Sequence, residues 1–247
     1  MAGDMGNRVN EMQEPRIQRR LLKTLLATGL LATSTLAAME AAPVKVDLRN
    51  GRDINEVCAG CHGEYGQGGK EGEYPRLAGL PAPFIAYQLV LFRDRKRTNL
   101  AMVESVDHRQ MPDPDIQDVS AYLASLEIAS KLPPADETAP GFNAYERLLA
   151  SKRLVQIPRA EGDPEAGQKL YRRECASCHG DQGQGDLRDA VPFLAGQYTN
   201  YLWRQIDKYI DKARLHDPSD PDAEELLAAF KTEELRDILA YLSILDD

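Results

Sequence analysis

The residues best suited to chemistry in this chain are thiols paired with imidazoles. All four cysteines lie in copies of the pattern Cys-x-x-Cys-His, which comprises Cys58, Cys61 and His62 in the first copy and Cys175, Cys178 and His179 in the second. Two thiols one helical turn apart can form thioethers with the two vinyl groups of one porphyrin, and the adjacent imidazole can bind the iron. The pattern therefore predicts two covalently attached haem c groups, each with a histidine as its first axial ligand.

Other uses of cysteine explain these motifs less well. A thioredoxin-like redox pair would need a βαβ setting, and the sequence shows no convincing strand alternation. Four cysteines could form a structural zinc site, but the two pairs are far apart along the chain. Disulfides could form in an exported protein. Neither zinc nor disulfides account for the histidine after each pair, so haem attachment is the favoured interpretation.

The motifs belong to an internal repeat with an offset of 117 residues, the separation of Cys58 from Cys175. Eight residues after the first motif recur at this offset after the second. The pairs are Gly63 and Gly180, Gly66 and Gly183, Gly68 and Gly185, Pro75 and Pro192, Leu77 and Leu194, Ala78 and Ala195, Gly79 and Gly196, and Gln88 and Gln205. The offset grows to 119 where Ala121-Tyr122-Leu123 recurs as Ala240-Tyr241-Leu242. Such agreement indicates duplication of one folding unit.

Each unit is predicted to be mainly helical. Asp163 can cap a helix that has Pro164 at its first position and leads to the second motif. Segments beginning at Phe84 and Tyr201 carry apolar residues three and four apart, and the closing segments 115–126 and 232–245 show the same period. We therefore expect an all-α fold.

The chain is expected to divide into an N-terminal segment, two domains and a linker. Residues 1–42 place a basic region before an apolar run, which is typical of a secretory signal or, alternatively, of an N-terminal membrane anchor. The first domain is expected at 43–130 and the second at 161–247. The Pro-containing segment 131–160 is expected to link them, with a brief helix within 142–157.

Charge narrows the range of partners. The formal net charge is −9, which argues against nucleic acid and suits encounters with basic patches on other proteins. The run Arg93, Arg95, Lys96 and Arg97 is an exception. We interpret it as a solvated helix end; contact with haem propionates or an acidic partner is the alternative.

The sequence resembles the dihaem cytochromes c4 and their relatives, which include the cytochrome subunit of flavocytochrome c sulfide dehydrogenase. The resemblance covers about residues 50–128 and 163–245 and rests on the Cys-x-x-Cys-His motif with Gly63, Tyr74-Pro75-Arg76-Leu77-Ala78-Gly79, Gln88 with Phe92-Arg93, Arg97-Thr98-Asn99, and the helix from Asp115 to Leu123. It implies two tandem class I cytochrome c domains. It also implies that Pro75 and Pro192 lie beside the haems and help to orient the proximal imidazoles.

The sixth ligand of the first haem is expected after the Arg97-Thr98-Asn99 segment. The resemblance implies Met102, whose thioether would raise the reduction potential. The stretch from Asp107 to Pro112 is longer than is usual in the family, so Met111 and His108 are alternatives. Met111 lies so close to the closing helix that it could instead fill the core.

The second unit has no methionine after His179, so the family's usual ligand is missing there. His216 is the only later histidine, and the repeat places it opposite Asn99, close to the ligand segment of the first unit. We expect His216 to bind the second iron. The alternatives are an open iron site and a solvated histidine at a helix end.

The leading hypothesis is a periplasmic electron carrier or electron-transfer subunit. Its expected partners are redox proteins: a dehydrogenase, a quinol-oxidising complex or a terminal oxidase. Different axial ligands would give the two haems different potentials. The alternative is a dihaem redox enzyme, such as a peroxidase or a thiosulfate-oxidising type. With every cysteine used for attachment and no acid–base constellation in view, we expect electron transfer rather than catalysis.

Overall fold

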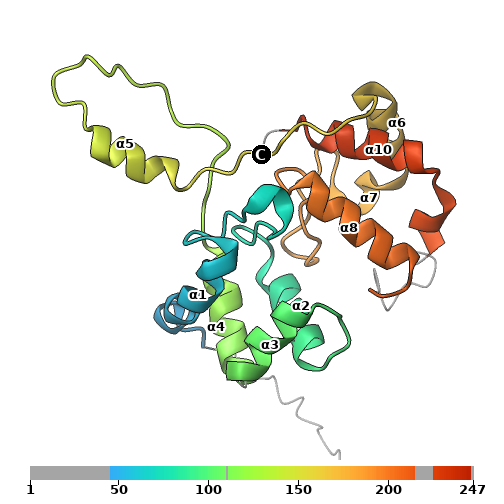
Figure 1. Cartoon of the computed structure of the whole chain (residues 1–247), viewed down its shortest axis with the longest axis horizontal. Coiled ribbons are helices and arrows are strands. Elements are labelled where there is room, and N and C mark those ends of the chain that lie inside the picture. The colour runs from blue at the N-terminus through green and yellow to red at the C-terminus, as the bar shows by residue number, and fades with distance from the viewer. Residues whose placement is uncertain (1–44, 110, 215–224, 246–247) are drawn as a thin grey trace, which may run out of the picture. The chain divides into compact units, whose positions relative to one another are not determined.

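The computed structural model describes residues 45–109, 111–214 and 225–245 (Figure 1). The N-terminal segment 1–42 lies outside the described residues. The described parts contain helices and isolated bridges but no strands, which confirms the predicted all-α fold. None of the helices in these parts is long and apolar enough to cross a membrane.

The first half contains four α-helices and a short 3-10 turn at Lys70–Gly72: α1 (Leu48–His62), α2 (Ala82–Arg93), α3 (Leu100–Arg109) and α4 (Asp113–Ala124). The first of these begins at a capping residue, because the Asp47 carboxylate accepts the backbone N–H groups of Arg49 and Asn50 at 2.9 and 3.3 Å. It ends with the haem-attachment motif, since Gly63 follows with a φ of 81°. The motif therefore occupies the last two turns of α1.

The second half repeats this arrangement with α6 (Pro164–Glu174), α7 (Ala176–His179), α8 (Thr199–Ile210), a 3-10 turn at Leu227–Ala229 and α10 (Thr232–Leu242). The predicted cap is confirmed, because the Asp163 carboxylate accepts the N–H groups of Glu165 and Ala166. The halves differ at the attachment motif. The helix that carries the second motif is interrupted at Cys175, whereas α1 is continuous.

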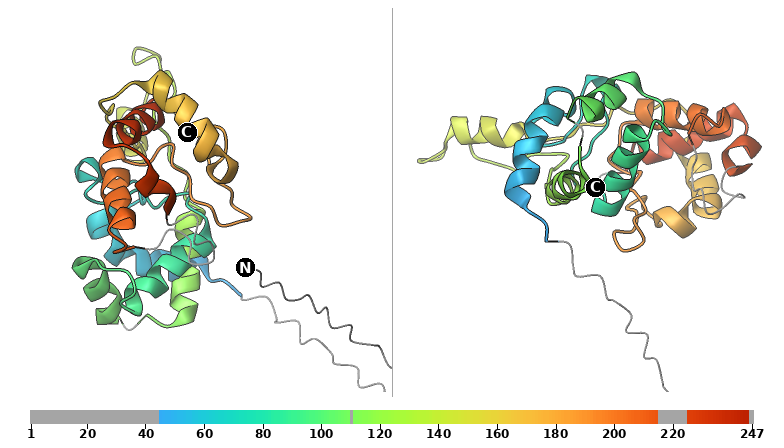
Figure 2. Two further views of the ribbon diagram at one scale, coloured as in Figure 1. Left: turned by 90° about the vertical axis from the view of Figure 1, so that its right-hand side faces the viewer. Right: turned by 90° about the horizontal axis from the view of Figure 1, so that it is seen from below.

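In each half the first helix packs across the last helix. The contacts are between α1 and α4 and between α6 and α10, the latter visible in Figures 1 and 2. Both crossings depend on glycine. A Cβ atom at Gly51 would lie 2.2 Å from the backbone oxygen of Asp118, and one at Gly167 would lie 1.8 Å from that of Asp237. Only a residue without a side chain allows the helix backbones to approach so closely.

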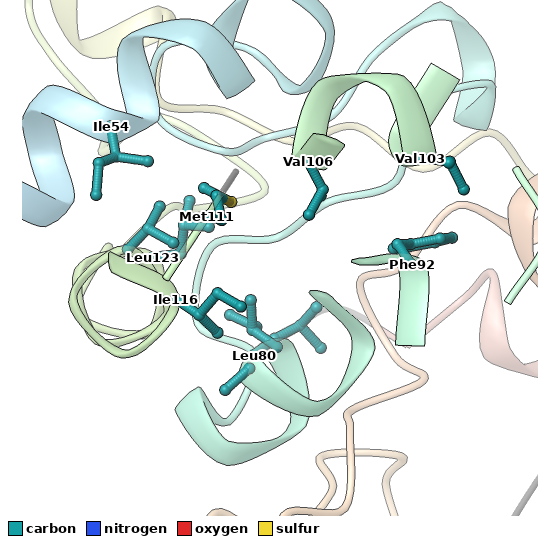
Figure 3. Close-up of a cluster of buried hydrophobic side chains, with 11 residues drawn as sticks. Ile54, Leu80, Phe92, Val103, Val106, Met111, Ile116 and Leu123 are labelled. Atoms are coloured by element: carbon teal, nitrogen blue, oxygen red, sulfur yellow. The ribbon is translucent and has the colours of Figure 1, made fainter. Parts of the chain in front are cut away.

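Two separate clusters of buried side chains form the cores. The first, shown in Figure 3, comprises Ile54, Leu80, Ile85, Ala86, Phe92, Val103, Val106, Met111, Ile116, Val119 and Leu123. The second comprises Tyr171, Ala176, Ile238, Leu239, Tyr241 and Leu242. Each half therefore buries its own apolar surface.

Between the halves the chain makes an excursion that contains α5 (Ala144–Ser151). The prediction of a brief helix within 142–157 is thus confirmed. Two backbone hydrogen bonds close the base of the excursion: Ala129 donates to Arg153 at 3.2 Å, and Val155 donates to Ala129 at 2.9 Å. We call residues 130–154 the excursion below.

Candidate haem-binding sites

His62 is held in one orientation by the loop that follows α1. Its side chain is buried, and its Nδ1 lies 2.9 Å from the backbone oxygen of Pro75. Because that carbonyl can only accept, Nδ1 carries the proton and Nε2 keeps a lone pair for a metal. Burial lowers the pKa of His62, against a smaller raising effect of the Pro75 carbonyl. The neutral imidazole is the form that binds iron.

His179 has the same arrangement in the second half. Its Nδ1 lies 3.0 Å from the backbone oxygen of Pro192. The backbone N–H groups of Gly68 and Gly185 donate to the carbonyl oxygens of His62 and His179, both at 2.8 Å. The structure thus contains two copies of one site, each with an imidazole held through its Nδ1.

These loops are tight, and glycine is required in them. Gly68 has a φ of 78°, and a Cβ atom there would lie 2.7 Å from the backbone oxygen of Tyr74. Its counterpart Gly185 has a φ of 71° and the same restriction against Val191. The repeated glycines therefore allow each loop to turn back, so that its proline carbonyl reaches the imidazole of the motif.

None of the four cysteines forms a disulfide. In each pair the first, Cys58 or Cys175, is half-buried, whereas the second, Cys61 or Cys178, is exposed. Burial raises the pKa of the Cys175 thiol to about 11. Among the described residues no group of three or more His, Cys, Asp or Glu side chains could hold a metal ion.

The two methionine candidates lie in different surroundings. Met111 is 6% exposed and packs among Ile54, Val106 and Leu123 in the first core (Figure 3). Met102, in α3, is half-buried beside that core. At the offset of 119, the position of Met111 is taken by Phe230, which packs against the second core. An apolar residue thus fills this position in both halves, as expected of a core residue.

The two histidine candidates for the distal side are not described to the same extent. The backbone of His108 belongs to α3, but its side chain lies outside the described part of the structure. His216 lies outside the described residues altogether.

One group of residues in the structure contradicts a sequence-based interpretation. Arg97, assigned to a solvated helix end, is only 9% exposed. Its partner in the repeat, Arg214, is 5% exposed and was not singled out from the sequence at all. The offset of 117 that relates them was the available signal. A buried donor, Nε of Arg214, has no hydrogen-bond partner.

The residues present fit two haem groups. Each half offers two thiols one helical turn apart, neither of them in a disulfide, and an imidazole oriented through its Nδ1. The unsatisfied guanidinium nitrogen of Arg214 is a donor that suits an acidic substituent, such as a porphyrin carries.

Comparison with known proteins agrees with this geometry. The sequence profile described as Cytochrome c matches residues 48–127 and, a second time, residues 164–246. Cytochrome c4 of Pseudomonas aeruginosa is 25% identical over 226 residues, which cover 92% of this chain and 98% of that protein. The thiosulfate dehydrogenase electron acceptor of Thiomonas intermedia is 32% identical over 202 residues, which cover 82% of this chain and 81% of the relative.

A solved structure shows the same fold. The crystal structure of reduced cytochrome c4 from Pseudomonas stutzeri aligns with a TM-score of 0.62 at 21% identity, over 81% of this chain and 100% of that one. The repeated profile match and the duplicated site define a two-domain protein of the cytochrome c family. Within that family the chain belongs to the dihaem cytochromes c4, carries two covalently bound haem c groups and transfers electrons.

Proposed function

We propose that this protein accepts single electrons from a dehydrogenase or a quinol-oxidising complex and passes them to a further redox protein, such as a terminal oxidase. The observation that carries the proposal is the exposure of Cys61 and Cys178 beside the buried His62 and, in the second half, the oriented His179. Each haem would be attached through a cysteine at the surface, where a partner can approach.

The names of relatives support this class of partner. Two are thiosulfate dehydrogenase electron acceptors, from Stutzerimonas stutzeri and Thiomonas intermedia. Another is the cytochrome c subunit of a cytochrome bc1 complex in Corynebacterium diphtheriae, 26% identical over 225 residues. The net charge of −9 suits docking on basic surfaces, with association that salt would weaken.

We assign the ligands as follows. Bound haem supplies the one-electron iron couple, and its axial ligands and surroundings set the potential. His62 and His179 serve as the proximal ligands, and the carbonyl groups of Pro75 and Pro192 hold their imidazoles in place. Met102 serves as the distal ligand in the first half.

In the second half we assign the distal position to His216. No methionine follows His179, and imidazole is a good ligand for iron. A thioether favours ferrous iron more than an imidazole does, so the first haem would have the higher potential. Electrons would then run from the second haem to the first within one molecule.

The protein is proposed to act in the periplasm. Residues 1–42 have the order of a basic region and an apolar run that is typical of a signal peptide, with an N-terminal membrane anchor as the alternative. After this segment we divide the chain into a first domain at 43–130, a linker at 131–160 and a second domain at 161–247.

The experiment is rapid mixing of the oxidised protein with a thiosulfate dehydrogenase. We expect thiosulfate and the dehydrogenase together to reduce both haems, at a rate that falls as ionic strength rises. Thiosulfate alone should leave the haems oxidised. Absence of reduction by this enzyme and also by a quinol-oxidising bc1 complex would contradict the proposal, and so would catalytic consumption of thiosulfate by the protein on its own.

A further inference from the structure

A glutamine of the second half holds the backbone of one residue of the first half through two hydrogen bonds. The backbone N–H of Arg76 donates to Oε1 of Gln197 at 3.0 Å, and Nε2 of Gln197 donates to the backbone oxygen of Arg76 at 2.9 Å. Oε1 also accepts the backbone N–H of Tyr198 at 3.1 Å. Because an N–H only donates and a carbonyl only accepts, these partners fix which end of the amide faces which group.

This pairing is shielded from water. Gln197 is 4% exposed and Arg76 is 7% exposed. Water therefore has little access to replace either hydrogen bond, and a buried backbone group that loses its partner carries a large free-energy cost. The side chain of Gln197 thus keeps the peptide group between Pro75 and Arg76 in one orientation.

The peptide group that Gln197 holds is also the one that orients His62. Its N–H, on Arg76, donates to Gln197, and its carbonyl oxygen, on Pro75, lies 2.9 Å from Nδ1 of His62. One planar unit thus connects an imidazole of the first half with an amide of the second. Hydrogen bonds at the two ends of a peptide group polarise it in the same sense, and each strengthens the other by about 10–30%.

The first half has a different side chain at the matching position. The offset of 117 places Leu80 opposite Gln197 and Phe193 opposite Arg76. Leu80 belongs to the first core, and Phe193 packs against that core. A leucine side chain has no hydrogen-bond donor or acceptor. The peptide group that orients His179 therefore receives no amide from this position.

We propose that Gln197 is a positioning residue for His62 and that it lowers the reduction potential of the first haem from across the junction. Its bond to the Arg76 N–H makes the Pro75 carbonyl a stronger acceptor for the Nδ1 proton. An imidazole whose proton is held more strongly carries more negative charge, and it favours ferric over ferrous iron. This effect opposes that of the unequal distal ligands. The inference rests on the proposed ligation of iron by His62 and not on the identity of the redox partners.

The test is Gln197→Leu, which gives the second half the residue that the first half has at this position. A spectroelectrochemical titration that resolves both haems should show the first potential raised. We expect about a threefold change in the ferric-to-ferrous ratio at fixed ambient potential, which is about 28 mV for a one-electron couple. The second potential should stay the same. A first potential that is unchanged or lower, or an equal rise at both haems, would contradict the proposal.

Nuclear magnetic resonance of the isotope-labelled ferrous protein gives a readout that a general loss of stability does not move. The Nδ1 proton of His62 should shift to higher field in Gln197→Leu, because its hydrogen bond is weaker, while that of His179 keeps its position. The haem ring current identifies the protons of iron ligands. A His62 proton without the ring-current shift would contradict the proposed ligation itself. A proton that has this shift but does not move in the variant would contradict only the role of Gln197.

Arg204→Gln is the matched control. Arg204 also joins the halves, because its guanidinium donates to the backbone oxygens of Gly72 and Glu73, in the same loop as Pro75. This variant leaves the partners of Gln197 in place, so both potentials and both Nδ1 protons should be unchanged. A rise in the first potential equal to that in Gln197→Leu would trace the effect to a loosened junction and overturn the assignment.

A measurement on the unmodified protein keeps the proposal testable if Gln197→Leu does not fold. Scalar couplings across hydrogen bonds should join the amide nitrogen of Arg76 to the side-chain carbonyl carbon of Gln197. They should also join Nδ1 of His62 to the carbonyl carbon of Pro75. Both couplings are required if two hydrogen bonds act on one peptide group, and the absence of either would overturn the proposal.

Discussion

The backbone oxygen of Pro75 lies 2.9 Å from Nδ1 of His62, and Pro192 stands in the same relation to His179 at 3.0 Å. The polypeptide alone therefore sets the tautomer and the direction of each proximal imidazole. An iron that binds at Nε2 leaves that hydrogen bond unchanged. Two sites of this kind leave the distal ligands as the main means of making the two haems unequal.

Met102→Ala should remove the methionine–iron charge-transfer band of the protein, because we assign the thioether of Met102 to the first iron. The potential of the first haem should fall as well. Absorption spectra of the oxidised protein and a redox titration check both effects.

Met111→Leu is the matched control for this ligand. Met111 is buried in the first core, and an exchange of methionine for leucine should lower the free energy of unfolding by less than about 1.5 kcal/mol. The charge-transfer band should persist. A band lost in Met111→Leu and kept in Met102→Ala would reverse the assignment.

His216→Ala should convert the second haem to high-spin ferric iron while both haems stay attached. Removal of the only imidazole proposed for that distal position leaves water or no ligand there. Electron paramagnetic resonance reports the spin state, and the mass of the protein reports attachment. An unchanged low-spin spectrum would eliminate His216 as a ligand.

Gly167→Ala should lower the free energy of unfolding by about 3 kcal/mol or more. The new Cβ atom would lie 1.8 Å from the Asp237 backbone oxygen, so α6 and α10 would have to separate. Thermal unfolding followed by circular dichroism measures the loss.

Gly69→Ala provides the comparison for that substitution. A Cβ atom at Gly69 meets nothing within 4 Å, and its φ of 177° is extended backbone that alanine adopts readily. This variant should unfold within about 0.5 kcal/mol of the unmodified protein. Equal losses in the two variants would show that the helix crossing tolerates a methyl group.

Tyr171→Phe should lower the free energy of unfolding by about 1–2 kcal/mol near neutral pH. The fully buried Tyr171 hydroxyl donates to the backbone oxygen of Gly180 at 2.7 Å, and phenylalanine leaves that carbonyl with the Gly183 N–H, at 3.1 Å, as its remaining donor. Burial, with a smaller effect of neighbouring acidic groups, raises the pKa of Tyr171 well above its ordinary value.

The difference between Tyr171→Phe and the unmodified protein should depend on pH in one direction. A group whose pKa is raised by folding contributes its stability below the pKa of the unfolded chain, about 10 for tyrosine. The advantage of Tyr171 should therefore be constant from neutral pH to about pH 9 and decline above about pH 10. Denaturant unfolding at several pH values checks this, and an advantage that grew with pH would contradict it.

The sequence was most informative where the cause is local. The cap at Asp163, the period of the closing helices and the glycines after each motif depend on neighbours along the chain, and the all-α fold followed from them. The attachment motifs are equally local. Their spacing alone indicates two thiols and an imidazole for one porphyrin.

The burial of Arg97 could not be read from its neighbours. Its sequence context is a run of basic residues, which normally lies in water. Its partners Tyr201 and Gln205 come from the other half of the chain, more than 100 residues away. The interruption of the helix at Cys175 could not be predicted from the motif either. The second motif differs from the first, which lies in the continuous α1, only at Ser177, where the first has Gly60.

The closed base of the excursion makes the length of the linker independent of the distance that it has to span. Because Ala129 and Val155 are hydrogen-bonded to one another, the chain leaves and re-enters at neighbouring points, and the fully enclosed Val155 fixes the point of return. Length gained or lost within 130–154 is then absorbed outside the path that connects the two haem domains. Insertions, deletions or new binding residues could therefore arise in this part of the chain without a change in the segment that connects the two domains.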